Sequence, residues 1–244
     1  MNQGNDEPNS GNAGYGVRVT SSVGAFTAEE WATFRGTTKS SNNTYNPFLS
    51  FAFLSSLEDA GCAAARNGWQ GNHLRLETTD GTLVGAVPGY LKSHSQGEYV
   101  FDHGWADAFE RAGGQYYPKL QCSVPFTPVT GPRLLVAEGQ NEIAIKAGLA
   151  AATKAVTDQL GISSAHLTFL QDDDLGVLEA SGFLHRTDQQ FHFFNEGFSS
   201  YDDFLGTLAS RKRKALKKER REALLGDITI DRLTGKDITE GAWD

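Results

Sequence analysis

The amino-acid sequence predicts an α/β (α+β) protein with a mixed central sheet flanked by helices. Segments that alternate between apolar and polar residues, as strands do, are interleaved with segments of helical periodicity. One strong hairpin signal, Asp80 followed by Gly81, joins two strands early in the chain, whereas later strands stand alone between helices. With 39% hydrophobic residues, the 244-residue chain has enough apolar surface for a folded core.

The expected elements follow in order along the chain. Strand-like patterns span residues 15–23, 73–94 (the hairpin), 119–136, 164–170 and 183–194. Helical patterns span residues 27–34, 46–61, 105–114, 140–160, 172–183 and 201–226. Thr27 and Glu30 have the spacing of a capping box, and Asn46 before Pro47 is typical of a helix start. Glycines at or just after the ends of three of these patterns predict where the helices stop: Gly61, Gly161 and Gly182.

The bulk composition indicates an acidic protein of the cytoplasm. The net charge of −8 argues against a molecule that coats nucleic acid. The chain has two cysteines, Cys62 and Cys122, outside any metal-ligand spacing, so we expect free thiols and no metal site. Neither a leader peptide nor an apolar run long enough for a membrane span is expected.

The charge is concentrated in one segment. Residues 211–222 contain eight of the 22 basic residues and two of the 30 acidic ones. As part of a helix over 201–226, these cations fall mostly opposite an apolar arc, but Lys212 and Glu219 fall inside it and are expected to face inward. The segment is either a solvated helix face or a platform for anions such as phosphates. The basic residues that we assign to ligand binding are Arg211, Lys212, Arg213, Lys214 and Lys218.

A second candidate site is the aromatic and charged stretch VFDHGWADAFERAGGQYYPKL at residues 100–120. Asp102 and His103 are the candidate general bases. The candidate ligand contacts are His94, Trp105, Tyr116, Tyr117 and Lys119. A structural interpretation is also open, in which Asp102 caps a short helix and Trp105 and Phe109 pack into the core.

Other polar residues favour structural roles. The run of acids at 172–174 is typical of a helix start, where acids favour the helix dipole. His166 and His192 lie in strand patterns and are interpreted as hydrogen-bonded core histidines. The common nucleotide, zinc and hydrolase motifs are absent from the sequence.

The beginning of the chain is echoed near its end. VRVTSSVGAFTAEEW at 17–31 and ITIDRLTGKDITEGAW at 228–243 share an alternating strand, a glycine, and a threonine four residues before a tryptophan. We therefore expect a strand at the start of the second copy, and this chain to be the first part of a two-domain protein. The expected layout is a disordered tail (1–14), a first domain (15–200), a basic connecting helix (201–226) and the truncated start of a second domain (227–244).

Five stretches of the sequence carry a family resemblance. They are NPFLSFAFLSSLEDAG (46–61), GYLKSHSQGEYVFDHGWADAFERAGGQYYPKLQ (89–121), VPFTPVTGPRLL (124–135), QFHFFN (190–195) and SRKRKALKKERR (210–221). In order and spacing they resemble bacterial peptidoglycan biosynthesis/recognition proteins, a family related to the Fem-type aminoacyltransferases. The resemblance implies GNAT-like acyl-CoA N-acyltransferase domains, two in tandem. The pyrophosphate loop of ordinary acetyltransferases does not precede the 140–160 helix, so acyl-CoA binding by this first domain is not expected.

The function implied by the resemblance is transfer of an acyl or aminoacyl group to an amine, for example of a cell-wall precursor. The donor would be acyl-CoA or aminoacyl-tRNA, which makes tRNA a candidate partner, and no firmly bound cofactor is expected. Asp102 or His103 would serve as base, while Lys119 and the basic cluster would bind phosphates. The alternative is a non-catalytic recognition module that binds an anionic partner through the basic helix.

Overall fold

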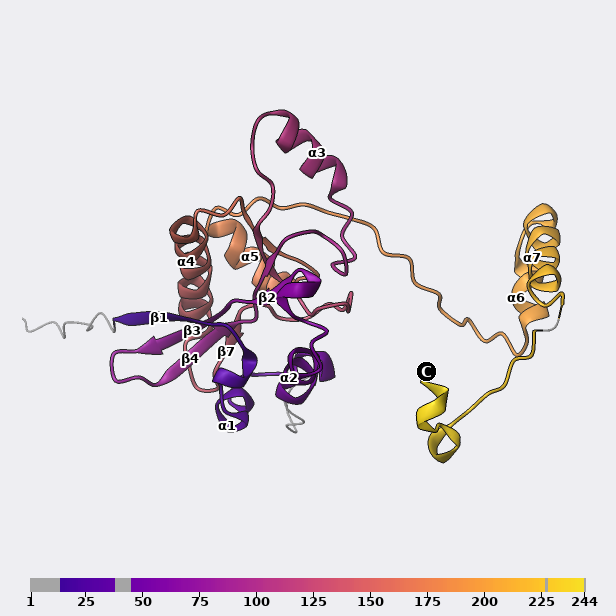
Figure 1. Ribbon diagram of the computed structural model, residues 1–244, viewed down its shortest axis with the longest axis horizontal. Coiled ribbons are helices and arrows are strands. Elements are labelled where there is room, and N and C mark those ends of the chain that lie inside the picture. The colour runs from indigo at the N-terminus through magenta and orange to yellow at the C-terminus, as the bar shows by residue number, and fades with distance from the viewer. Residues whose placement is uncertain (1–13, 38–44, 227, 244) are drawn as a thin grey trace, which may run out of the picture. The chain divides into compact units, whose positions relative to one another are not determined.

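A computed structural model of the protein describes residues 14–37, 45–226 and 228–243. Helices and strands both occur, which confirms the expected α+β class (Figure 1). The chain divides into two compact units, residues 1–188 and 189–244. The tail predicted at 1–14 lies outside the described residues except for Gly14.

The first unit contains two four-stranded sheets, so the single central sheet expected from the sequence is wrong. The first sheet has the strand order β1-β3-β4-β7 and is antiparallel throughout. The second has the order β2-β5-β6-β8, in which β6 and β8 are parallel and the other pairs antiparallel. The strands are β1 (Tyr15–Thr20), β2 (Trp69–Gly71), β3 (His73–Thr78), β4 (Leu83–Val87), β5 (Tyr90–Lys92), β6 (Lys119–Cys122), β7 (Leu135–Val136) and β8 (Ala165–Leu167).

One hairpin contributes strands to both sheets, because each of its two arms is interrupted at the same position along the hairpin. Asn72 separates β2 from β3, while Pro88 and Gly89 separate β4 from β5. Pro88 has no N–H to donate to a strand ladder. Gly89 lies so close to the opposite arm that a Cβ would be 2.8 Å from the carbonyl oxygen of Asn72. The tip of the hairpin, with Gly81 at φ 86°, therefore belongs to the first sheet and its base to the second.

Helices cover the first sheet on both sides. α4 (Glu142–Leu160) and α5 (Asp172–Ala180) lie on one side, and α1 (Ala28–Ala32) and α2 (Phe51–Asp59) lie on the other (Figure 1). α4 packs closely because β4 has a glycine at the contact: a Cβ on Gly85 would lie 2.8 Å from Ile145. Burying these apolar faces provides the main stabilisation of the unit.

Local capping signals in the sequence are confirmed. Thr27 and Glu30 form a reciprocal capping box at the start of α1. Gly161 ends α4 with a left-handed backbone at φ 62°, as predicted. Asn141, which was not predicted as a cap, caps the start of this helix. The short helix expected within 105–114 is α3 (His103–Arg111), which projects from the sheets (Figure 1).

Two predicted elements differ from the structure. The helix expected over 46–61 is divided into a 3₁₀ turn, Pro47–Leu49, and α2, because Ser50 adopts an extended backbone with ψ 148° and caps α2. The strand expected over 183–194 does not form: these residues have no regular structure. An alternating pattern needs a neighbouring strand to supply its hydrogen bonds, and no described strand pairs with this segment.

The second unit consists of a helical pair and an irregular C-terminal part. The single helix expected over 201–226 is two helices, α6 (Tyr201–Thr207) and α7 (Ser210–Ala223), because Leu208 is extended with ψ 149°. Their side chains meet: Lys217 lies 2.9 Å from Asp202, and the Arg220 guanidinium lies 4.5 Å from the centre of the Tyr201 ring. The strand expected after residue 227 is absent from the described residues 228–243, which hold two 3₁₀ turns, Gly235–Asp237 and Glu240–Ala242. The tandem-domain layout stays a prediction.

Candidate functional site

One face of the second sheet is polar although it is buried. The strand register places Trp69 opposite Lys92, Lys92 opposite Lys119, and Gln121 opposite Tyr90 and His166. Residues directly opposite each other in a sheet share a face. We call this set the polar face: Trp69, Tyr90, Lys92, Lys119, Gln121 and His166. The other face presents Leu120 and Cys122 to the apolar core.

Lys119 is the centre of a buried ion cluster. Its Nζ donates hydrogen bonds to Ser95 Oγ at 2.9 Å, Glu98 Oε2 at 2.8 Å and Asp102 Oδ2 at 2.5 Å. Lys119 is fully buried, and the side chains of Glu98 and Asp102 are each 1% exposed. These partners come from the segment between β5 and α3, so this segment covers the polar face.

Two tyrosines complete the cluster. Tyr116 Oη donates to Asp102 Oδ2 at 2.8 Å, and Tyr117 Oη lies 2.8 Å from Ser95 Oγ. Asp102 occupies the position before α3, but its side chain makes no capping bond, so the capping interpretation is wrong. Burial alone would raise the pKa of Asp102, yet hydrogen bonds from Lys119, Ser95 and Tyr116 lower it to about 2. Asp102 is therefore ionised at neutral pH.

Lys92 has a different environment from Lys119. Its Nζ lies 3.5 Å from the centre of the Trp69 ring and donates to the carbonyl oxygen of Gln96 at 3.1 Å. Burial lowers the pKa of Lys92 to about 7, with Lys119 acting in the same direction and Glu98 against it. A neutral amine is therefore well populated at neutral pH.

Several buried polar atoms here have no hydrogen-bond partner among the described residues. They are Trp69 Nε1, Glu98 Oε1, Asp102 Oδ1, Gln121 Oε1 and Ser123 Oγ. Buried polar atoms in native proteins are nearly always paired, and each exception calls for an explanation. Carboxylate and amide oxygens accept hydrogen bonds and cannot donate them. The oxygens of Glu98, Asp102 and Gln121 therefore have unused acceptor capacity, and Trp69 Nε1 is an unused N–H donor.

His166 lies at the edge of the same face. Its Nε2 is 2.8 Å from Ser164 Oγ, and its ring meets Tyr116 edge-on with the centres 6.1 Å apart. Burial, followed by the charge of Lys119, lowers the pKa of His166 to about 4, so the ring is neutral at pH 7. The Ser164 contact agrees with the interpretation of His166 as a hydrogen-bonded histidine, although the residue is half-buried. His192 is exposed and lies outside any strand, so its interpretation as a core histidine is wrong.

Comparison with known families identifies the group to which this chain is related. The profile of the FemAB-like family, described as peptidoglycan biosynthesis/recognition, matches residues 22–244. The chain belongs to this FemAB-like family. No curated protein matches the sequence.

The remaining predicted residues of this FemAB-like protein near α3 lie outside the ion cluster. His103 and Trp105 are exposed on α3, and among described residues the His103 ring makes neither a hydrogen bond nor an ion pair. Trp105 is 65% and Phe109 45% exposed, so their interpretation as core contacts is wrong. His94 accepts a hydrogen bond from the Gln96 N–H at 3.2 Å, and burial followed by the charge of Lys92 lowers its pKa.

The predicted basic residues lie on α7, in the second unit. Lys212 and Glu219 are exposed, so the expectation that they face inward is wrong. Since α7 has no buried residue, charged side chains within its apolar arc stay in solvent and need no buried partner. Arg213 is half-buried, unlike the other predicted basic residues, and its Nη2 donates to the carbonyl oxygen of Leu208 at 3.0 Å. The exposed predicted residues are Arg211, Lys212, Lys214 and Lys218.

Sequence reasoning missed part of the site. Lys92, Glu98 and Gln121 were not singled out, although Lys92, Lys119 and Gln121 all stand at alternating strand positions. Within the described ranges, no three His, Cys, Asp or Glu side chains gather as metal ligands, and none of the helices is long and apolar enough to cross a membrane.

Proposed function

We propose that this FemAB-like protein takes part in transferring an acyl or aminoacyl group to an amine of a peptidoglycan precursor, and that the polar face binds the amine. Family membership supports a role in peptidoglycan biosynthesis or recognition. The observation that carries the assignment to an amine is the set of unpaired acceptor oxygens on Glu98, Asp102 and Gln121 beside Lys92. An amine supplies the hydrogen bonds that these oxygens lack.

The chemistry requires a neutral amine nitrogen. Its lone pair attacks the acyl carbonyl carbon and a C–N bond forms. The nitrogen then loses its second proton, and the leaving group departs with the electron pair of the bond that breaks and takes up that proton. Before attack, the ammonium form must give a proton to a base, and a base works best when its pKa lies near the operating pH. Lys92, whose pKa is about 7, fits this role better than Asp102, whose pKa is about 2.

Asp102 and Lys119 then orient the acceptor amine. Their mutual ion pair and the Tyr116 hydrogen bond hold the second oxygen of Asp102 toward the acceptor without proton exchange. Tyr117 fixes Ser95, which fixes Lys119 in turn. Such fixed partners reduce the reorganisation that a reaction would otherwise need.

The donor in this proposal is acyl-CoA or aminoacyl-tRNA, bound outside the first unit. The residues before α4 read AEGQN and are followed by Glu142, an acid in the first helical turn. An acid there competes with a phosphate for the same helix N-terminus, which favours a donor site elsewhere.

A transfer assay tests the proposal directly. The full chain is incubated with acetyl-CoA or charged tRNA and an amine-bearing muropeptide precursor, and mass spectrometry measures the acylated product. Wild-type protein should form product, and Lys92→Met should reduce the rate by about 100-fold or more. Lys154→Met, a change at an exposed lysine of α4, is the matched control. Absence of product with both donors, or an unchanged rate in Lys92→Met, would contradict the proposal.

A second candidate function rests on α7. Seven of its basic side chains are exposed, namely Arg211, Lys212, Lys214, Lys217, Lys218, Arg220 and Arg221. Recognition of an anionic partner through this helix would weaken steeply with salt. Reversing Lys214 and Lys218 to Glu would abolish such binding without changing a transfer rate measured with a small acyl donor, which separates the two functions.

A further inference from the structure

β1 forms one edge of the first sheet and is open along its outer side. All of its residues, Tyr15–Thr20, pair with β3, and no described strand pairs with its other side. Five of these six residues are exposed, and Thr20 is half-buried. In an edge strand, the backbone N–H and C=O groups that point outward lack partners, so they are available to bind a further strand.

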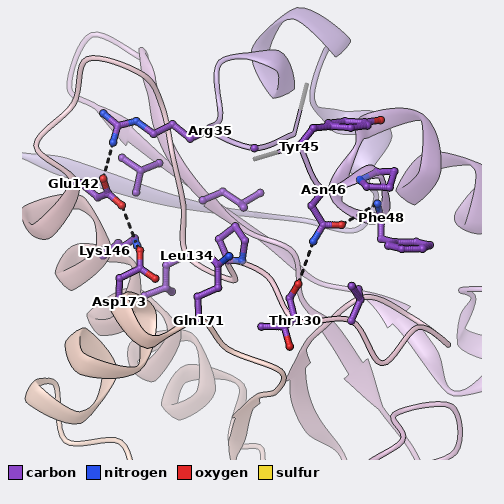
Figure 2. Close-up of a pocket in the computed structure, with 16 residues that line it drawn as sticks. Arg35, Tyr45, Asn46, Phe48, Thr130, Leu134, Glu142, Lys146, Gln171 and Asp173 are labelled. Carbon is purple, nitrogen blue, oxygen red and sulfur yellow. Dashed lines mark hydrogen bonds and ion pairs between the residues drawn. The ribbon is translucent and has the colours of Figure 1, made fainter. Parts of the chain in front are cut away.

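The other edge strands of the two sheets are shorter than β1. β2 and β8 have three residues each, and β7 has two. β7 is also covered, because the Arg35 N–H donates to the carbonyl oxygen of Val136 at 3.3 Å, and the Arg35 side chain lies 2.6 Å from Glu142 of α4 (Figure 2). Short or covered edges prevent unwanted strand pairing, as do lysines and prolines on an edge. Among the described residues, β1 has none of these protections.

The exposed apolar residues of β1 continue an apolar face of the sheet. Val17 is opposite Leu76 and Val19 is opposite Leu74, and opposite residues share a face. Both leucines are buried in the core that includes residues of α4. Val17 and Val19 are 45% and 42% exposed, and Tyr15, on the same face, is 44% exposed. This stripe of β1 therefore lies in solvent, and burying it would be favourable.

The stripe is complementary to itself. When two copies of β1 pair antiparallel about a two-fold axis at Val17, this valine faces its own counterpart and Tyr15 faces Val19 of the other copy. Aromatic and β-branched pairs of this kind stabilise antiparallel strands. We propose that β1 is a homodimer interface, at which two copies of this chain join their four-stranded sheets into one continuous sheet.

The opposite face of β1 favours the same register. Gly16 then faces Arg18 of the other copy, and there is room for the arginine, because a Cβ on Gly16 would have no atom within 4 Å. Glu77 lies opposite Gly16 on β3, so the arginine of each copy points toward a carboxylate of the other. A register centred on Arg18 would instead place two arginines opposite each other, which is destabilising. Charge and apolar contacts therefore select the pairing about Val17.

The dimer does not depend on the proposed transfer reaction. β1 belongs to the first sheet, whereas the polar face belongs to the second. Pairing of two six-residue strands buries less surface than the roughly 1,200–2,000 Å² of a stable interface, so we expect a dissociation constant in the micromolar range.

Sedimentation velocity of the full chain measures the association. Wild-type protein should change from monomer to dimer between about 10 and about 500 µM, a range that spans micromolar dissociation constants. Val17→Lys places two ammonium groups opposite each other and should weaken dimerisation by about tenfold or more. Ile143→Lys, the same kind of change at a 74% exposed residue of α4, should leave it within about twofold. A monomeric wild type, or equal dimerisation of the two variants, would overturn the proposal.

A mixture of variants distinguishes a lost interface from a damaged strand. Val17→Lys and Val17→Glu each place like charges at the two-fold axis, whereas an equimolar mixture places opposite charges there. The mixture should form a heterodimer at concentrations at which each folded variant alone is monomeric. If two folded variants remain monomeric when mixed, the proposal is wrong.

Two double variants test the register within one chain. Tyr15→Glu combined with Val19→Lys brings opposite charges together in both outer cross-strand pairs and should retain the dimer. Tyr15→Lys combined with Val19→Lys brings like charges together and should lose it. Equal association of the two double variants would contradict the pairing about Val17. These variants decide the question if circular dichroism shows that the Val17 variants do not fold.

Discussion

The Nζ of Lys119 lies 2.5 Å from Oδ2 of Asp102, and these two side chains are 0% and 1% exposed. The contact joins β6 to Asp102, the last residue of the segment between β5 and α3. We call this segment, which covers the polar face, the covering segment. Removing both charges from water is costly, and their attraction compensates for it only while both are present. The pair therefore holds the covering segment on the polar face.

Replacing Lys119 with Met should lower the free energy of unfolding by about 3–5 kcal/mol, because Glu98 and Asp102 would keep buried charges without their cation. Urea denaturation at pH 7 measures the change. Lys154→Met, at an exposed lysine in α4 that donates a hydrogen bond to the Ser181 carbonyl oxygen, should change the free energy by no more than about 1 kcal/mol. Adding Asp102→Asn to Lys119→Met should recover part of the loss. If Lys119→Met is as stable as the control, the pair does not hold the segment.

Asp102 should also make stability depend on pH in the acid range. Its pKa is about 2 in the folded state, below the unfolded value of about 3.9. A lowered folded pKa contributes stability that is present above about pH 4 and is lost as the pH falls toward 2. The contribution is about 2–3 kcal/mol. The difference in unfolding free energy between wild type and Asp102→Asn should therefore shrink between pH 5 and pH 2, and a constant difference would contradict this assignment.

Local signals in the sequence predicted much of the fold. The capping box of Thr27 and Glu30 and the turn at Gly81 depend on residues within a few positions of each other, so the sequence contains all that decides them. The division into two sheets depends on Pro88 and Gly89 meeting Asn72 on the opposite arm of the hairpin. An alternating pattern of apolar and polar residues contains no information about a contact between residues far apart in the sequence.

The candidate site was predicted only in part for a similar reason. Asp102, Tyr116, Tyr117 and Lys119 were singled out by composition, and the structure brings them together. Lys92 was missed, because a lysine at an alternating strand position normally faces solvent. The segment after β5 folds back over this face because of its tertiary contacts with Lys119. The sequence pattern does not contain these contacts.

Transfer activity should follow the protonation of Lys92. Since the neutral amine is the proposed base, kcat/KM should rise with pH through an inflection near pH 7 and fall as the pH drops below it. Lys92→Arg keeps a positive charge that does not titrate in this range, so its activity should be low and the inflection absent. A rate profile from pH 5.5 to 9 measures this. Lys154→Arg should retain the wild-type inflection; its persistence in Lys92→Arg would exclude Lys92 as the base.

A substitution at Arg213 tests whether this basic residue of α7 stabilises the end of α6 or is available to bind an anionic ligand. Its Nη2 donates to the Leu208 carbonyl oxygen at the end of α6, where helix carbonyls have no partner within the helix. Arg213→Gln should remove a hydrogen bond worth about 1 kcal/mol, so amides of α6 should exchange with deuterium about fivefold faster. Arg211→Gln, an exposed neighbour on the same helix, should leave α6 exchange unchanged. Mass spectrometry of the exchanged full chain measures both. Similar exchange in the two variants would mean that Arg213 does not stabilise the end of α6, and would return it to the residues available for an anionic ligand.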